Sequence, residues 1–155
     1  MNDKVPFQFD PRLKLDQQTC FPVYALSRLM TKIYQPFLES VKLTYPQYLV
    51  MILVWEHQEI TVKELGKKLL LDTGTLTPLL KLLEQRQLIS RRRDSKDERS
   101  VLIALQPAGQ ALHEQARQIP EELSKRFSLT RNDVAVLRKE LNNLMTLLSG
   151  PYPIA

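Results

Sequence analysis

The chain has 155 residues with a formal net charge of +5, and 43% of them are hydrophobic, enough for one globular domain with its own core. A single cysteine excludes an intramolecular disulfide, and the two histidines fit no known metal-ligand spacing, so we expect no metal and no cofactor. The longest apolar run, residues 48–55, is far shorter than the roughly 20 residues that span a bilayer, so we expect no membrane segment and a cytoplasmic location.

The first part of the chain is predicted to be an arm followed by a helix. Residues 1–17 contain two prolines and mixed charges, which is typical of a terminal segment that is ordered only when it packs on a partner. A helical pattern starts at Thr19, and Pro36 is predicted to interrupt it. Five residues share one face of this helix at helical spacing: Cys20, Tyr24, Ser27, Thr31 and Tyr34.

Cys20 lies where this helix is predicted to begin. Pro22 is tolerated in the first turn of a helix, which sets the start near Phe21 and leaves Cys20 at or just before that turn. The free peptide N–H groups and the helix dipole at this end favour a thiolate over a thiol. A small buried cysteine is the common alternative, and the tyrosines on the same face favour a reactive one.

Two capping boxes predict the next helices. Thr44-Tyr-Pro-Gln47 opens a helix through Trp55, and the centre of this helix is apolar on every side and therefore buried. Residues 59–62 are compatible with a short strand, and Thr61-Val-Lys-Glu64 begins a short helix over residues 62–70.

The segment 71–93 is predicted to read DNA. A tight turn at residues 71–72 leads into a helix over residues 73–87, which together with the helix 62–70 has the dimensions of a helix-turn-helix. The start of the second helix offers short polar groups that can approach base edges and phosphates: Asp72, Thr73, Gly74, Thr75 and Thr77. Behind them, leucines at helical spacing predict an apolar face that docks on a core: Leu76, Leu79, Leu80, Leu82 and Leu83.

A β-hairpin is predicted to follow this helix. The strand-compatible segments 88–93 and 100–105 are separated by the charged residues 94–99, a pattern typical of the wing of a winged helix. Five basic and three acidic residues lie between Arg91 and Arg99. A solvated loop is the alternative interpretation of this charge run, and the hairpin context favours contact with phosphates or the minor groove.

The last third of the chain is predicted to be helical. Pro107 opens a long helix toward Phe127 with a kink at Pro120, and the capping box Thr130-Arg-Asn-Asp133 opens the last helix. A narrow apolar seam of coiled-coil spacing runs along the last helix: Val134, Leu137, Leu141, Leu144 and Leu148. This seam suits a two-fold partner, and packing on its own domain is the alternative.

The order of these elements, with the segments 71–81, 97–99 and 105–109, resembles the MarR family of winged-helix transcription factors. The segments 18–24 and 43–48 are similar to its organic-hydroperoxide-sensing branch, the OhrR-type repressors. The resemblance covers residues 16–148, although Pro22 stands where the family usually has an ordinary helix former. It implies a mainly α winged helix-turn-helix fold with a small β-hairpin wing, as a single domain over residues 1–155 that forms a homodimer. In that domain, the resemblance assigns residues 46–106 to the DNA-binding core, and residues 16–45 and 107–150 to the dimerisation helices.

The resemblance also implies roles for particular residues. Cys20 is the redox sensor, Tyr34 and Tyr45 contact its sulfur from the opposite subunit, and Tyr24 lines the same pocket. Arg99 enters the minor groove and Asp97 orients it. The helix over residues 73–87 is the recognition helix, and the hairpin that follows it is the wing. The residues expected to bind DNA lie in these two elements: Thr73, Gly74, Thr75, Thr77, Pro78, Lys81, Arg91, Arg92, Arg93, Lys96, Asp97 and Arg99. Because a second cysteine is absent, a low-molecular-weight thiol caps the sulfenic acid of Cys20, or the sulfur is oxidised further.

The function expected from these features is that of a transcriptional repressor that binds double-stranded operator DNA. It senses an organic hydroperoxide by oxidation of Cys20, releases the operator and has no catalytic residues. Two alternatives remain open. One is a MarR-type repressor released by a small aromatic ligand, with Cys20 incidental. The other is a one-cysteine thiol peroxidase, although the sequence lacks a thioredoxin-like βαβ pattern.

Overall fold

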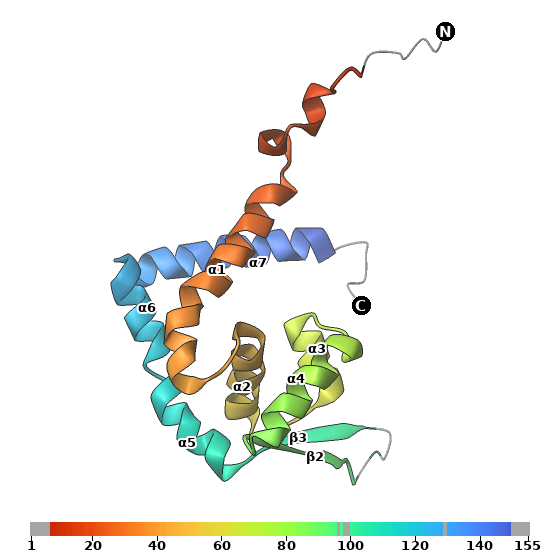
Figure 1. Ribbon diagram of the computed structural model, residues 1–155, viewed down its shortest axis with the longest axis vertical. Coiled ribbons are helices and arrows are strands. Elements are labelled where there is room, and N and C mark those ends of the chain that lie inside the picture. Colours follow the sequence, from red (N-terminus) through yellow and green to blue (C-terminus); the bar gives the residue numbers. More distant parts are fainter. Residues whose placement is uncertain (1–6, 96, 98–99, 129, 150–155) are drawn as a thin grey trace. The chain divides into compact units, whose positions relative to one another are not determined.

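The computed structural model describes residues 7–95, 97, 100–128 and 130–149 (Figure 1). The chain divides into two compact units between Gln35 and Pro36, so each unit is described by itself. Helix α1, Cys20–Val41, contributes to both units. Among the described residues, no helix is both long and apolar enough to cross a membrane.

The first unit holds two short 3-10 turns, Pro11–Leu13 and Leu15–Gln17, and most of α1. Asp10 caps the first turn by accepting a hydrogen bond from the Arg12 peptide N–H at 2.9 Å, and it pairs with the Arg12 guanidinium at 2.6 Å. These local contacts lie within the segment that the sequence predicted to be an arm.

Helix α1 begins at Cys20, which agrees with the predicted position of Cys20 at the first turn. The prediction that Pro36 interrupts this helix is wrong, because α1 continues through Pro36 to Val41. Proline matches the φ angle of a helix and removes one backbone hydrogen bond. Burial of Leu38 and Val41, 2% and 1% exposed, offsets that loss in the last turn of α1.

The second unit is built around α2, Tyr45–His57, and a small sheet. The predicted capping box is confirmed, since Thr44 and Gln47 exchange side-chain and backbone hydrogen bonds at the start of α2. Most of the centre of α2 is buried, with Val50, Met51 and Val54 fully enclosed, but Ile52 is 38% exposed, so the expectation of burial on every side is wrong at that residue. Burial on several sides is possible because the apolar residues of α2 do not gather on one face.

Three antiparallel strands form the sheet in the order β1-β3-β2. They are β1, Glu59–Thr61, β2, Ile89–Arg93, and β3, Val101–Leu105. Pairing of Ile89 with Leu105 and of Arg93 with Val101 confirms the predicted hairpin. The sheet leaves β2 at one edge.

The helix-turn-helix consists of α3, Val62–Leu69, and α4, Thr73–Gln85, which pack on each other and on the sheet (Figure 1). Leu76, Leu80 and Leu83 are buried at spacings of four and three, as predicted. The expectation that Leu82 shares this face is wrong, because Leu82 is 49% exposed. Each helical residue turns by about 100°, which points Leu82 away from the stripe that Leu76, Leu80 and Leu83 form.

The prediction of one kinked helix from Pro107 to Phe127 is also wrong. The segment forms two helices, α5, Pro107–Ala116, and α6, Ile119–Phe127. The ring of Pro120 would clash with the carbonyl group four residues earlier, at Ala116, so α5 ends there and Pro120 becomes the second residue of α6.

Helix α7, Arg131–Ser149, starts at the predicted capping box, where Thr130 and Asp133 exchange hydrogen bonds. The predicted seam is open along most of its length: Leu144 is half-buried, while Val134, Leu137, Leu141 and Leu148 are exposed. The described part of the chain therefore leaves an apolar stripe of α7 uncovered.

Candidate functional site

The start of α4 is held by one carboxylate. Asp72 accepts hydrogen bonds from the Thr75 peptide N–H and the Thr75 hydroxyl, both at 2.9 Å. The peptide N–H and then the hydroxyl of Thr75 lower the pKa of Asp72, so its carboxylate stays charged. A Cβ atom at Gly74 would lie 2.9 Å from the Asp72 Oδ1 atom, so a larger residue at this position would displace the capping carboxylate.

Hydrogen bonds orient the threonine hydroxyl groups in the first turns of α4. Thr77 donates a hydrogen bond from its Oγ1 atom to the Thr73 carbonyl at 2.7 Å, and Thr75 donates to Asp72. Their oxygens remain available as acceptors on an exposed surface. Pro78 and Lys81 follow on the same helix and are also exposed.

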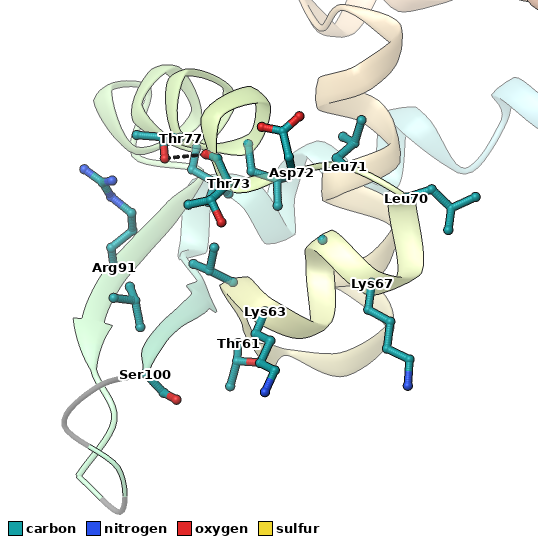
Figure 2. A pocket seen from close by; sticks show the side chains of 15 residues that line it. Thr61, Lys63, Lys67, Leu70, Leu71, Asp72, Thr73, Thr77, Arg91 and Ser100 are labelled. Carbon is teal, nitrogen blue, oxygen red and sulfur yellow. Dashed lines mark hydrogen bonds between the residues drawn. The ribbon is translucent and has the colours of Figure 1, made fainter. Parts of the chain in front are cut away.

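A groove of about 970 Å³ lies beside this turn, between α3, α4 and the hairpin (Figure 2). Lys63 and Lys67 come from α3, Thr73 and Thr77 from α4, and Arg91 from β2. The rest of the lining is mostly apolar: Val62, Leu70, Leu71, Leu76, Leu80 and Val101. Asp72 also lines the groove, which therefore combines three cationic groups and one carboxylate with hydroxyls and an apolar wall.

Arg91 and Arg92 of β2 are paired with acids. The Arg91 Nε atom donates to the Glu84 Oε2 atom at 2.7 Å, and the Arg92 guanidinium contacts Glu59 at 2.7 Å. Glu59 raises the pKa of Arg92 through this hydrogen bond and its charge. Arg93 is exposed at the end of β2.

Two of the residues predicted for the tip of the hairpin, Lys96 and Arg99, lie outside the described residues. Asp97 is exposed. Its carbonyl accepts a hydrogen bond from the Ser100 peptide N–H at 2.8 Å, and its carboxylate accepts one from the Ser100 hydroxyl at 2.9 Å. The Asp94 peptide N–H donates to the Ser100 carbonyl at 2.9 Å and closes the hairpin. These bonds fix the described part of the turn.

Cys20 is the exposed first residue of α1. Tyr24 lies one turn further along and is 59% exposed, with the Arg28 guanidinium 5.8 Å from its ring centroid. Tyr34 is half-buried on the same helix.

Tyr45, the fourth residue predicted for the sensor region, belongs to the second unit and is the first residue of α2. It is half-buried, and burial raises the pKa of its phenol.

The sequence has relatives among transcriptional regulators. It matches the family described as transcriptional regulator SarA/Rot over residues 32–115. It is 47% identical over 141 residues to the organic hydroperoxide resistance transcriptional regulator of Bacillus subtilis, a match that covers 91% of this chain and 95% of the relative. The chain belongs to the MarR family, in its OhrR-type branch.

Solved structures of the MarR family have the same fold. Reduced AbfR of Staphylococcus epidermidis bound to DNA superposes with a TM-score of 0.73 at 33% identity, over 88% of this chain and 96% of that chain. Overoxidised AbfR bound to DNA gives a TM-score of 0.69. Wild-type MarR of E. coli gives 0.63 at 27% identity, over 82% and 96% of the two chains. These matches confirm the mainly α winged-helix fold and a regulator rather than an enzyme.

Sequence reasoning missed three residues that the winged helix places beside the predicted DNA contacts. Lys63 and Lys67 line the groove, and their spacing of four residues on a short helix before the recognition helix was a usable signal. Glu84 pairs with Arg91, a contact between a helix and a later strand that no local spacing indicates.

Proposed function

We propose that the protein is a repressor that binds operator DNA as a homodimer and releases it when an organic hydroperoxide oxidises Cys20. The observation that carries this proposal is the polar start of α4 beside a cationic groove and a hairpin, in an OhrR-type chain with one exposed cysteine at the start of α1. The site of action is the cytoplasm.

DNA binding follows from the shape of the winged helix. The start of α4 enters the major groove and the hairpin tip reaches the minor groove, so the sugar-phosphate backbone of one strand passes between them. The groove beside α4 has the position and charge for that backbone, with Lys63 and Lys67 as phosphate contacts and with Arg91, held by Glu84, beside the same strand. The other contacts come from the recognition helix and the hairpin: Thr73, Gly74, Thr75, Thr77, Pro78, Lys81, Arg92, Arg93, Lys96, Asp97 and Arg99.

Dimer formation accounts for the open seam of α7. Residues 16–45 and 107–150 form the dimerisation helices, and residues 46–106 form the DNA-binding core. The exposed side chains of Leu137, Leu141 and Leu148 support this assignment, because a second copy removes their apolar surface from water. Two recognition helices related by a two-fold axis then read two half-sites about one helical turn apart.

The sensor reaction takes place at the Cys20 sulfur. The thiolate attacks the O–O bond of the hydroperoxide and takes one oxygen to become a sulfenic acid, while the other oxygen leaves as an alkoxide that takes a proton to give the alcohol. A low-molecular-weight thiol then condenses with the sulfenic acid, which forms a mixed disulfide and water. In the proposed dimer, Tyr34 and Tyr45 of the opposite subunit contact the sulfur and Tyr24 lines the same pocket, where phenol groups donate hydrogen bonds to the sulfur anion.

The test is fluorescence anisotropy with the DNA upstream of the protein's own gene, with and without one equivalent of cumene hydroperoxide. Wild type is expected to bind the DNA and to release it on oxidation. Cys20→Ser is expected to bind the DNA equally well and to retain it in the presence of the peroxide. Release of both proteins by the peroxide means that Cys20 is not the switch. Retention of DNA by both proteins, also after a low-molecular-weight thiol is added with the peroxide, means that peroxide is not the signal, and release by a small aromatic acid then favours the ligand-controlled repressor.

A further inference from the structure

Glu84 joins the recognition helix to the wing at two points. Its Oε1 atom accepts a hydrogen bond from the peptide N–H of Arg91 at 3.2 Å, and its Oε2 atom accepts one from the Arg91 Nε atom at 2.7 Å. The Arg91 Nη2 atom lies 2.7 Å from the same Oε2 atom. One carboxylate near the end of α4 therefore binds both the backbone and the guanidinium of a residue in β2.

The hydrogen bond from the Arg91 peptide N–H to Glu84 matters because β2 lies at the edge of the sheet. Because β2 is an edge strand, its outward peptide groups face no neighbouring strand in the described part of the chain. The Arg91 N–H is such a group, and Glu84 takes the place of the missing strand. This contact fixes the hairpin against the end of α4.

The guanidinium contact controls a charge in the groove. Arg91 lines the groove beside Thr73 and Thr77, and its side chain is 33% exposed. A free arginine at this place would attract phosphates of any DNA sequence, since phosphate contacts carry no base information. Glu84 compensates the charge and holds the guanidinium in one orientation.

We propose that Glu84 is a positioning residue that determines specificity, an inference that rests on the proposed DNA-binding function. It keeps α4 and the wing at a fixed spacing, so that base contacts of the helix and contacts of the hairpin form together only on the operator. It also prevents Arg91 from adding attraction that is independent of sequence.

The experiment compares operator and random duplexes over a series of salt concentrations. Glu84→Ala is expected to bind the operator more weakly and random DNA more tightly, so that the ratio of the two affinities falls about tenfold. The salt slope for random DNA is expected to steepen by about 1, the contribution of one released arginine that contacts a phosphate. The double variant Glu84→Ala/Arg91→Ala is expected to lose this added slope.

Two further variants separate the causes. Glu84→Gln keeps an acceptor for the Arg91 N–H but loses the charge, so it is expected to steepen the salt slope with a smaller loss of operator affinity. It also serves as the test if Glu84→Ala does not fold, as judged by circular dichroism. Glu114→Ala, on α5, removes the same charge from an exposed ion pair with Arg117 and is expected to leave the ratio unchanged.

Equal changes in both affinities for the Glu84 variants, with an unchanged salt slope, would overturn the inference. A change of the same size in Glu114→Ala would overturn it too, because net charge would then explain the effect. Wild type that binds operator and random DNA equally would instead refute the proposed function.

Discussion

The DNA-binding core and the cysteine end of α1 differ in how much of their structure one chain supplies. In the core, Leu65, Leu76 and Leu83 are 0–1% exposed, and side-chain caps hold the starts of α3 and α4. One turn along α1 from Cys20, Val23 and Tyr24 are 46% and 59% exposed. A single protomer thus builds the surface that reads DNA, whereas the proposed sensor depends on a second protomer for its surroundings.

The largest expected effect comes from a substitution in the buried core. Leu83→Ala removes a fully buried side chain of α4 and is expected to lower the free energy of unfolding by about 3 kcal/mol, from lost burial and a cavity. Urea denaturation followed by circular dichroism measures it. Leu82→Ala, one residue away but half-exposed, is the matched control and should change the free energy by less than about 1 kcal/mol. Equal losses would show that both leucines support the core.

A second prediction sharpens the comparison at the proposed dimer interface. Leu141→Ala combined with Leu144→Ala removes apolar surface from the seam of α7 and is expected to raise the dimer dissociation constant about 100-fold. Analytical ultracentrifugation measures it, while circular dichroism checks that each protomer stays folded. A dimer as tight as that of wild type would remove α7 from the interface.

The smallest expected effect concerns the cap of the recognition helix. Since the folded pKa of Asp72 is lowered, its carboxylate contributes stability above its unfolded pKa of about 3.9 and loses that contribution as the pH falls through the folded pKa. Asp72→Asn still caps the helix but does not titrate.

Stability measured from pH 6 to pH 2 should therefore fall more steeply in wild type than in Asp72→Asn. Glu64 and Asp133, whose pKa values are also lowered, are present in both proteins and cancel in the difference. Parallel curves would show that the Asp72 charge does not stabilise the fold.

Features set by residues close in sequence were predictable. The capping boxes at Thr44, Thr61 and Thr130 could be predicted, because each depends on two residues three positions apart. The hairpin was also predictable, since two apolar segments flank a charged turn. The family followed from short motifs spread over most of the chain.

Features set by tertiary packing were not predictable. Pro36 stays inside α1 because the buried residues beyond it hold the helix, and Leu82 is exposed although it lies among buried leucines. The pairing of Glu84 with Arg91 depends on the angle between a helix and a strand, which no periodicity contains. The surroundings of Cys20 depend on the proposed partner and so are not fixed within one chain.

The single tryptophan of the chain gives the second unit an optical probe of its own. Trp55 in α2 donates a hydrogen bond from its Nε1 atom to the Gly109 carbonyl in α5 at 2.8 Å, and its ring lies edge to face with His113 at 5.4 Å. Its fluorescence therefore reports on the packing of α2 against α5, without a label and without a signal from tryptophan elsewhere. A change in emission on DNA binding or oxidation would report on the surroundings of Trp55, in the unit that carries the recognition helix.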